Sequence, residues 1–356
     1  MRLVVVILLF AVYFFYAAQP IPLETVLVPR WISSVETGTP VFLTETGGDS
    51  NTLLPFSLGN RFGYISPNGA FSINQLKNGN ISLSPDRWAM YDAEPQHITV
   101  HGNDGGTLAV IENPNGYPFF LDGKTFLINN EQNAISSVNE SGGISWTHEF
   151  AGTITCIDSA AGLVLAGSLD GVIGVLDSRG QQVFTFEPGG SEYSIILGCA
   201  ISRNGSRLAV VSGINNQRFL ILERFGSNAI DYKVVYHEFI GGGFRRPVYL
   251  SFIENDRWVV FERNGGLGFY EVNSRHTSTV ELGGEIVAVD HSGGQGMVFT
   301  VISRSGTQKI LAGIRLPDKV ILESPFRSDE VFLSMVDSRL IVGGGQTLVS
   351  FDLERR

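Results

Sequence analysis

One unit recurs along most of this chain, a pair of short apolar runs joined by a tight turn. Residues 162–177 read GLVLAGSLDGVIGVLD, and the Asp170-Gly171 pair at the centre is typical of two-residue hairpin turns. The segment 153–186 aligns with 196–224 over its apolar runs and its turns. The same pattern returns at 248–272, 286–302 and 331–353, and upstream at 54–76 and 117–146. The chain is therefore a series of short antiparallel hairpins.

The length of the repeat predicts the architecture. Units begin near residues 153, 195, 248, 285 and 329, so the period is about 37 to 53 residues with about four strands in each unit. Such a period indicates the blades of a β-propeller, because one four-stranded sheet cannot bury both faces and must stack on others around an axis. The 42 glycines and the absence of long helical periodicity favour an all-β fold.

The number of blades follows from a count of candidate strands. Roughly 31 strands fit between Thr39 and Leu353, which favours eight blades. Seven blades would result if the irregular stretch 80–113 formed none. The last unit ends in TLVSFDLERR (347–356) without a fourth strand, and a closed ring needs that edge paired. We expect a propeller over 39–356, closed by a strand at about 39–46.

The N-terminus predicts export. Arg2 precedes the uncharged and mostly apolar residues 3–18, which as a helix would reach roughly 24 Å, short of a bilayer core of about 30 Å. Residues 1–18 therefore form a signal peptide or a signal-anchor helix, and residues 19–38, with three prolines, form a linker. The remaining chain is expected at the periplasmic face of the inner membrane, or in the periplasm if the signal is cleaved.

The net charge of −10 is spread along the chain without acidic or basic blocks. Nucleic-acid binding needs clusters of Lys and Arg that neutralise phosphates, and this sequence has none. We therefore expect no nucleic acid among the partners.

Two blades carry a motif that resembles the repeat of pyrroloquinoline-quinone-like (PQQ-like) propellers, A-x-D-x-x-G-x-x-x-W. In SVNESGGISW (137–146), Gly142 and Trp146 match the motif. In VLDSRGQQVF (175–184), an Asp and a Gly match, and Phe184 stands in the Trp position. The blades also resemble WD repeats, although no Trp-Asp dipeptide occurs.

The resemblance implies a scaffold more than an enzyme. Quinone-dependent dehydrogenases of this superfamily place a disulfide of adjacent cysteines against the cofactor and a calcium ion beside it. Here Cys156 and Cys199 are 43 residues apart. The chain looks more like the non-enzymatic members, such as the periplasmic propeller lipoprotein of the outer-membrane assembly machinery, although no Cys follows the apolar segment. Cys156 and Cys199 occupy equivalent strands, where they could be buried thiols or a disulfide.

Few residues stand out as candidates for a site. No GxSxG, HExxH, CxxC or P-loop motif occurs, so we predict no catalytic, metal-binding or cofactor-binding residue. Arg245 and Arg246 lie in the glycine-rich loop 241–250 and could contact an anion or an acidic partner. Three further candidates share a position near the end of the first strand of a blade, where they could line a central channel: Asp158, Asp290 and Asp337.

The sequence thus favours an exported, membrane-tethered propeller that binds other envelope proteins and has no catalytic activity. The alternative is an enzyme or a carbohydrate or small-ligand binder that uses the central channel. Carboxylates with perturbed pKa values converging on the axis would favour this alternative.

Overall fold

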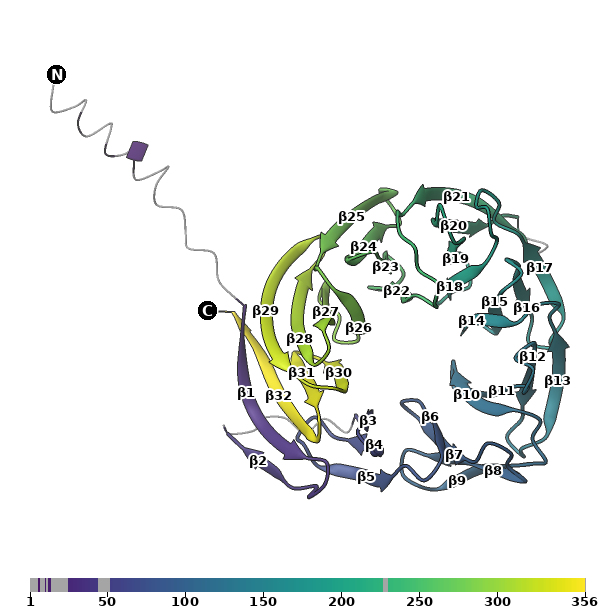
Figure 1. The fold of residues 1–356 in the computed structure, drawn as a ribbon, viewed down its shortest axis with the longest axis horizontal. Coiled ribbons are helices and arrows are strands. Elements are labelled where there is room, and N and C mark those ends of the chain that lie inside the picture. The colour runs from purple at the N-terminus through teal and green to yellow at the C-terminus, as the bar shows by residue number, and fades with distance from the viewer. Residues whose placement is uncertain are drawn as a thin grey trace.

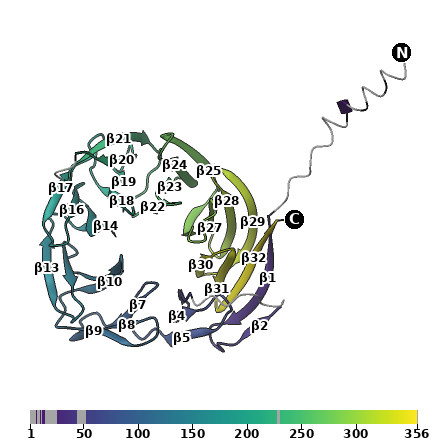
Figure 2. The same cartoon turned by 180° about the vertical axis from the view of Figure 1, so that it is seen from behind.

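The computed structural model describes residues 25–43, 52–226 and 230–355, together with residues 6, 10, 12 and 13. Eight antiparallel sheets follow one another around a ring, as Figure 1 and the reverse view in Figure 2 show. The predicted all-β, eight-bladed propeller is confirmed, and the irregular stretch 80–113 forms an ordinary four-stranded blade.

The predicted anchor helix over residues 1–18 lies outside the described residues, except for the four isolated positions named above. In the part of the chain that the structure describes, no helix has the length and hydropathy needed to cross a bilayer.

The blades are numbered along the chain, and within each complete blade the strands run from the axis to the rim. Blade 1 holds β3 (Leu54–Leu58), β4 (Arg61–Ile65) and β5 (Phe71–Leu76). Blade 2 holds β6 (Asn80–Leu83), β7 (Arg87–Tyr91), β8 (His97–Gly102) and β9 (Thr107–Glu112). Blade 3 holds β10 (Tyr117–Leu121), β11 (Lys124–Ile128), β12 (Ala134–Val138) and β13 (Ile144–Glu149). Blade 4 holds β14 (Ile154–Ala160), β15 (Leu163–Ser168), β16 (Ile173–Leu176) and β17 (Gln182–Phe186).

The second half of the ring follows the same plan. Blade 5 holds β18 (Ile196–Ile201), β19 (Arg207–Ser212), β20 (Arg218–Arg224) and β21 (Tyr232–Phe239). Blade 6 holds β22 (Leu250–Ile253), β23 (Trp258–Arg263), β24 (Gly266–Glu271) and β25 (His276–Glu281). Blade 7 holds β26 (Glu285–Asp290), β27 (Met297–Ser305), β28 (Gln308–Arg315) and β29 (Lys319–Arg327). Blade 8 holds β30 (Val331–Val336), β31 (Arg339–Gly344), β32 (Thr347–Arg355), β1 (Thr25–Ser34) and β2 (Pro40–Phe42).

The hairpin at residues 162–177 shows how the local sequence makes a blade. β15 and β16 pair in register and are buried along their whole length, because each face of the sheet packs on a neighbouring blade. The turn between them places Gly171 at φ +86°, a conformation that glycine adopts without the cost of a Cβ. The Ser168 hydroxyl donates to the Asp170 carboxylate and fixes the turn.

The ring closes through the N-terminal segment, but not as the sequence predicted. β1 pairs with β32 from Thr25 opposite Arg355 to Ser34 opposite Thr347. β2, inside the stretch 39–46 predicted to close the ring, is only the outer fifth strand of this sheet. The linker predicted over 19–38 and the closing strand predicted at 39–46 are therefore misplaced.

The physical reason is the burial available to each segment. Trp31 is fully buried, and its indole N–H donates to the Pro67 carbonyl 2.8 Å away in blade 1. The Arg30 guanidinium pairs with Asp352 of β32 at 2.6 Å. β1 thus connects blade 8 to blade 1 through a buried side chain. The side chains of Val41 and Phe42 in β2 are exposed instead.

Candidate functional site

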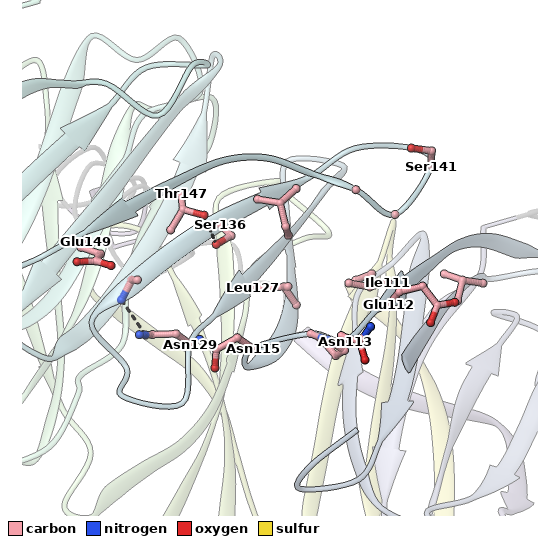
Figure 3. A pocket seen from close by; sticks show the side chains of 16 residues that line it. Ile111, Glu112, Asn113, Asn115, Leu127, Asn129, Ser136, Ser141, Thr147 and Glu149 are labelled. Atoms are coloured by element: carbon pink, nitrogen blue, oxygen red, sulfur yellow. Dashed lines mark hydrogen bonds between the residues drawn. The ribbon is translucent and has the colours of Figure 1, made fainter. Parts of the chain in front are cut away.

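A pocket of about 560 Å³ opens on the outer rim of the ring, between blades 2 and 3. We call it the rim pocket (Figure 3). One wall is β9, the outermost strand of blade 2, and the other is the face of blade 3 formed by β11, β12 and β13. Its lining is Val110, Ile111, Glu112, Asn113, Pro114, Asn115, Leu127, Asn129, Ala134, Ser136, Ser141, Gly142, Gly143, Ile144, Thr147 and Glu149.

The pocket exists because small side chains face each other there. Leu127, Ser136 and Thr147 lie side by side on neighbouring strands, on the face of blade 3 that is turned toward blade 2. The hydroxyls of Ser136 and Thr147 are 2.7 Å apart and hydrogen-bond to each other. Protein interiors are normally filled to crystal-like density, and two short hydroxyl side chains leave the outer part of this blade interface unfilled.

The interface between blades 5 and 6 is filled by larger side chains. There the row Val259, Tyr270 and Thr277 crosses blade 6 and faces blade 5. Tyr270 packs against Tyr236 of blade 5 with ring centroids 4.6 Å apart, and the Tyr236 hydroxyl lies 3.1 Å from Thr277 Oγ1. Two tyrosine rings thus fill part of the interface between blades 5 and 6, whereas the space next to Ser136 stays open.

Backbone structure shapes the two ends of the rim pocket. At one end, Asn129 Oδ1 accepts hydrogen bonds from the backbone N–H groups of Asn133 and Ala134 at 2.9 and 2.8 Å, which fixes the β11–β12 turn. At the other end, Gly142 has φ +88° and packs directly on the backbone of Val110, where a Cβ would collide with the carbonyl group. Gly142 is one of the two residues of this blade that match the PQQ-like motif.

The rim pocket has two carboxylates and no cation in its lining. Glu112 and Glu149 lie on opposite sides of it with Leu127 between them (Figure 3). Both are exposed, and neither forms an ion pair with another described residue. Three apolar side chains on the same two outer strands remain exposed to water at 36 to 50%: Leu108, Val110 and Ile144.

The predicted arginine loop forms a second, smaller pocket of about 420 Å³. Arg246 is already paired: its two Nη atoms lie 2.6 and 3.1 Å from the carboxylate of Glu262, whose side chain is only 3% exposed. A second carboxylate, that of Glu285, is 3.2 Å away. Arg246 thus neutralises a buried carboxylate inside the fold, whereas Arg245 is exposed and makes no ion pair with a described residue.

The three predicted channel aspartates have different surroundings. Asp158 lines an axial pocket of about 520 Å³, and its carboxylate accepts the N–H groups of Ile201 and Ser159, each at 2.8 Å. Burial raises the pKa of Asp158 despite these hydrogen bonds. Asp290 accepts the Ser292 N–H at 2.7 Å and is not part of the pocket lining. Asp337 is exposed in the β30–β31 turn and does not line the pocket either.

The axial pocket is also lined by polar residues that the sequence did not predict as ligands. They are Arg203, Glu254, Asn255, Asp256 and His291. Burial lowers the pKa of His291, whose Nε2 lies 3.4 Å from the Ser251 hydroxyl. Among the described residues, no three His, Cys, Asp or Glu side chains gather in an arrangement that would hold a metal ion.

Both cysteines are free thiols. Cys199 is buried, and burial raises its pKa well above the usual range. Of the two alternatives that the sequence left open, the free thiols hold and the disulfide does not, although only Cys199 is fully buried and Cys156 is half-buried.

The rim pocket was missed at the sequence level. The stretch AISSV in β12 does not alternate between apolar and polar residues, and nothing in it says which neighbouring blade each serine faces. The available signal was the pair of short polar side chains in β12, where the third strand of blade 6, β24, carries Phe269 and Tyr270.

Eight antiparallel sheets of three to five strands around an axis, closed by a strand from the opposite end of the chain, define the class of β-propeller proteins. This chain belongs to a family of β-propeller proteins, whose sequence profile matches residues 1–355.

Similar proteins agree with this assignment. An uncharacterised protein of Treponema pallidum (strain Nichols) is 28% identical over 282 residues, which are 78% of this chain and 74% of that protein. BamB from Moraxella catarrhalis has a similar structure, with a TM-score of 0.58 and 10% identity over 92% of this chain and all of that one. A chain of the mitotic checkpoint complex gives a TM-score of 0.57 and 13% identity over 88% and 97%. The identities of 10% and 13% to the two solved structures show a shared fold alone.

Proposed function

We propose that this protein is an exported, membrane-tethered propeller that acts as a non-catalytic scaffold for other proteins of the cell envelope. The rim pocket is the observation that carries the proposal. It combines an outermost strand, exposed apolar side chains and an open concave surface between two blades. Exposed apolar groups beside a concave surface are typical of protein-binding sites, and an outermost strand offers a further edge for contact.

The location rests on the apolar residues 3–18, which suit a signal or an anchor, and on the likeness in fold to BamB. Fold likeness is an analogy, so the location needs its own test. We expect the protein in the membrane fraction, released by detergent but not by alkaline carbonate, and cleaved by added protease only after the outer barrier is opened. A protein recovered from the soluble cytoplasmic fraction would contradict export.

The scaffold role is tested by site-specific crosslinking in the native cells. A photoreactive amino acid replaces Leu108 or Ile144 beside the rim pocket, and Val320 on the outer strand of blade 7 serves as the matched control. We expect the two rim-pocket positions to crosslink the same envelope proteins and the control position not to do so. Absence of crosslinked proteins at both rim-pocket positions would overturn the proposal.

The axial pocket supports the alternative of a small polar ligand or carbohydrate. Three consecutive residues beside it, Glu254, Asn255 and Asp256, have φ between 51° and 64°, and such strain often marks a functional site. A screen of sugars and small anions by thermal shift, with Arg203→Ala as the comparison, tests it. A ligand that stabilises the native protein but not this variant would favour the alternative over the scaffold.

A further inference from the structure

We infer that the rim pocket binds an extended polypeptide segment that carries basic side chains, supplied by a partner protein. This inference rests on the proposed scaffold function and specifies the chemistry of the partner. Three features of the pocket carry it: its course along the strands, its unpaired carboxylates and its mixed apolar and hydroxyl walls.

The course of the pocket matches an extended chain. Its lining runs from the loop Asn113–Asn115, which follows β9, to the turn Ser141–Gly143, which precedes β13. Figure 3 shows Ser141 at the end away from Asn113, Asn115 and Asn129. The pocket therefore follows the strands for their length, which for strands of five or six residues is about 17–20 Å. This length and course suit an extended segment that lies along the strands.

The charge of the pocket selects a basic occupant. Glu149 faces it from blade 3, Glu112 borders it at the end of β9, and its lining contains no Lys, Arg or His. An acidic segment would meet two like charges, whereas Lys or Arg side chains would pair with these carboxylates and be held by charge-assisted hydrogen bonds.

The walls suit the alternation of an extended segment, whose side chains point to opposite sides in turn. Apolar side chains on one side would cover Ile111, Leu127 and Ile144, of which Ile144 is otherwise exposed. The hydroxyls of Ser136 and Thr147 and the amide groups of the asparagines offer partners for backbone groups of the occupant. The expected segment is therefore extended, partly apolar and basic.

The test selects peptides without assuming a sequence. The purified full-length protein, held in detergent, is panned against phage-displayed random dodecapeptides, and enriched peptides are synthesised and titrated by fluorescence anisotropy. We expect enrichment of Lys or Arg together with apolar residues. The affinity should fall roughly tenfold in the double variant Glu112→Gln, Glu149→Gln, and weaken further as salt is raised.

Two comparison variants make the result specific. Ser136→Trp fills the pocket and should abolish peptide binding. Glu94→Gln removes an exposed carboxylate of the same blade 2 that does not line the pocket, and should leave the affinity unchanged. Because Glu112 and Glu149 are exposed, the double glutamine variant remains informative if Ser136→Trp does not fold.

The outcomes separate this inference from the scaffold role. Enriched peptides that are neutral or acidic, or whose affinity is unchanged in the double variant, would overturn the basic-segment inference while partners crosslinked at Leu108 and Ile144 would still support the scaffold. Absence of enriched peptides, together with absence of crosslinks, would overturn both.

Discussion

At the scale of single residues, Asp158 shows that a pattern can find a buried carboxylate without finding its role. Its oxygens accept two backbone N–H groups, and that of Ile201 belongs to the neighbouring blade. The side chain therefore joins β14 of blade 4 to the end of β18 of blade 5. Arg246 is a parallel case, because it neutralises the buried Glu262. Both residues therefore make contacts that stabilise the ring.

The raised pKa of Asp158 predicts a pH dependence of stability. The folded protein holds this proton more tightly than the unfolded chain, where an Asp titrates near pH 4, because burial opposes ionisation. The contribution of Asp158 to the free energy of unfolding should therefore fall as pH rises from about 4 through the raised pKa, and stay constant above it. Asp158→Asn should lack this decline, as urea unfolding between pH 4 and 8 would show. The exposed Asp337→Asn is the control, and its curve should run parallel to that of the native protein.

At the scale of elements, the blades differ in how completely they pack on one another. Between blades 5 and 6, Phe219 and Phe261 are fully buried and stack with centroids 4.0 Å apart. Between blades 2 and 3, the outer part of the interface holds Ser136 and Thr147 and stays open. A tightly filled interface gives stability, and an open one leaves a concave surface.

Substitutions at the two interfaces should differ in cost. Phe261→Ala removes a buried ring and its stacking contact with Phe219, so we expect the free energy of unfolding to fall by about 3–5 kcal/mol. Ser136→Ala removes one partly exposed hydrogen bond and should cost about 1 kcal/mol or less. Thermal and urea unfolding of both variants measure the difference. Equal costs would show that the rim-pocket interface is as closely packed as the other.

At the scale of the whole molecule, the ring depends on a joint between the two ends of the chain. β1 pairs with β32 over nine residue pairs, and the Arg30–Asp352 ion pair and the buried Trp31 lie along it. Without β1, the outer edge of β32 would be left unpaired, and blade 8 would lose the hydrogen bond from the Trp31 indole to Pro67 of blade 1.

Two truncations test this closure. Removing residues 1–24 leaves every described strand intact and should leave the unfolding temperature unchanged, whereas removing residues 1–36 also removes β1 and should lower it by roughly 10 °C or more. Calorimetry on both purified proteins gives the comparison. Equal unfolding temperatures would mean that β1 does not hold the ring closed.

The repeat by itself determined the fold class. The Asp-Gly turn at Asp170-Gly171 and the period of the units act locally along the chain, so the sequence predicted short antiparallel strands and eight blades. It also identified Asp158 as a residue near the axis, because the end of the first strand has a fixed place in a blade.

Only the tertiary structure decided which segment closes the ring, what Arg246 contacts and where the rim pocket lies. Arg30 and Asp352 are 322 residues apart, and no local pattern says that β1 rather than β2 pairs with β32. Likewise, strand alternation divides β12 into two faces but does not say that Ser136 faces blade 2 with nothing large opposite it. Periodicity is a property of neighbours along the chain, whereas closure and cavities depend on which distant surfaces meet and how well their side chains fill the space between them.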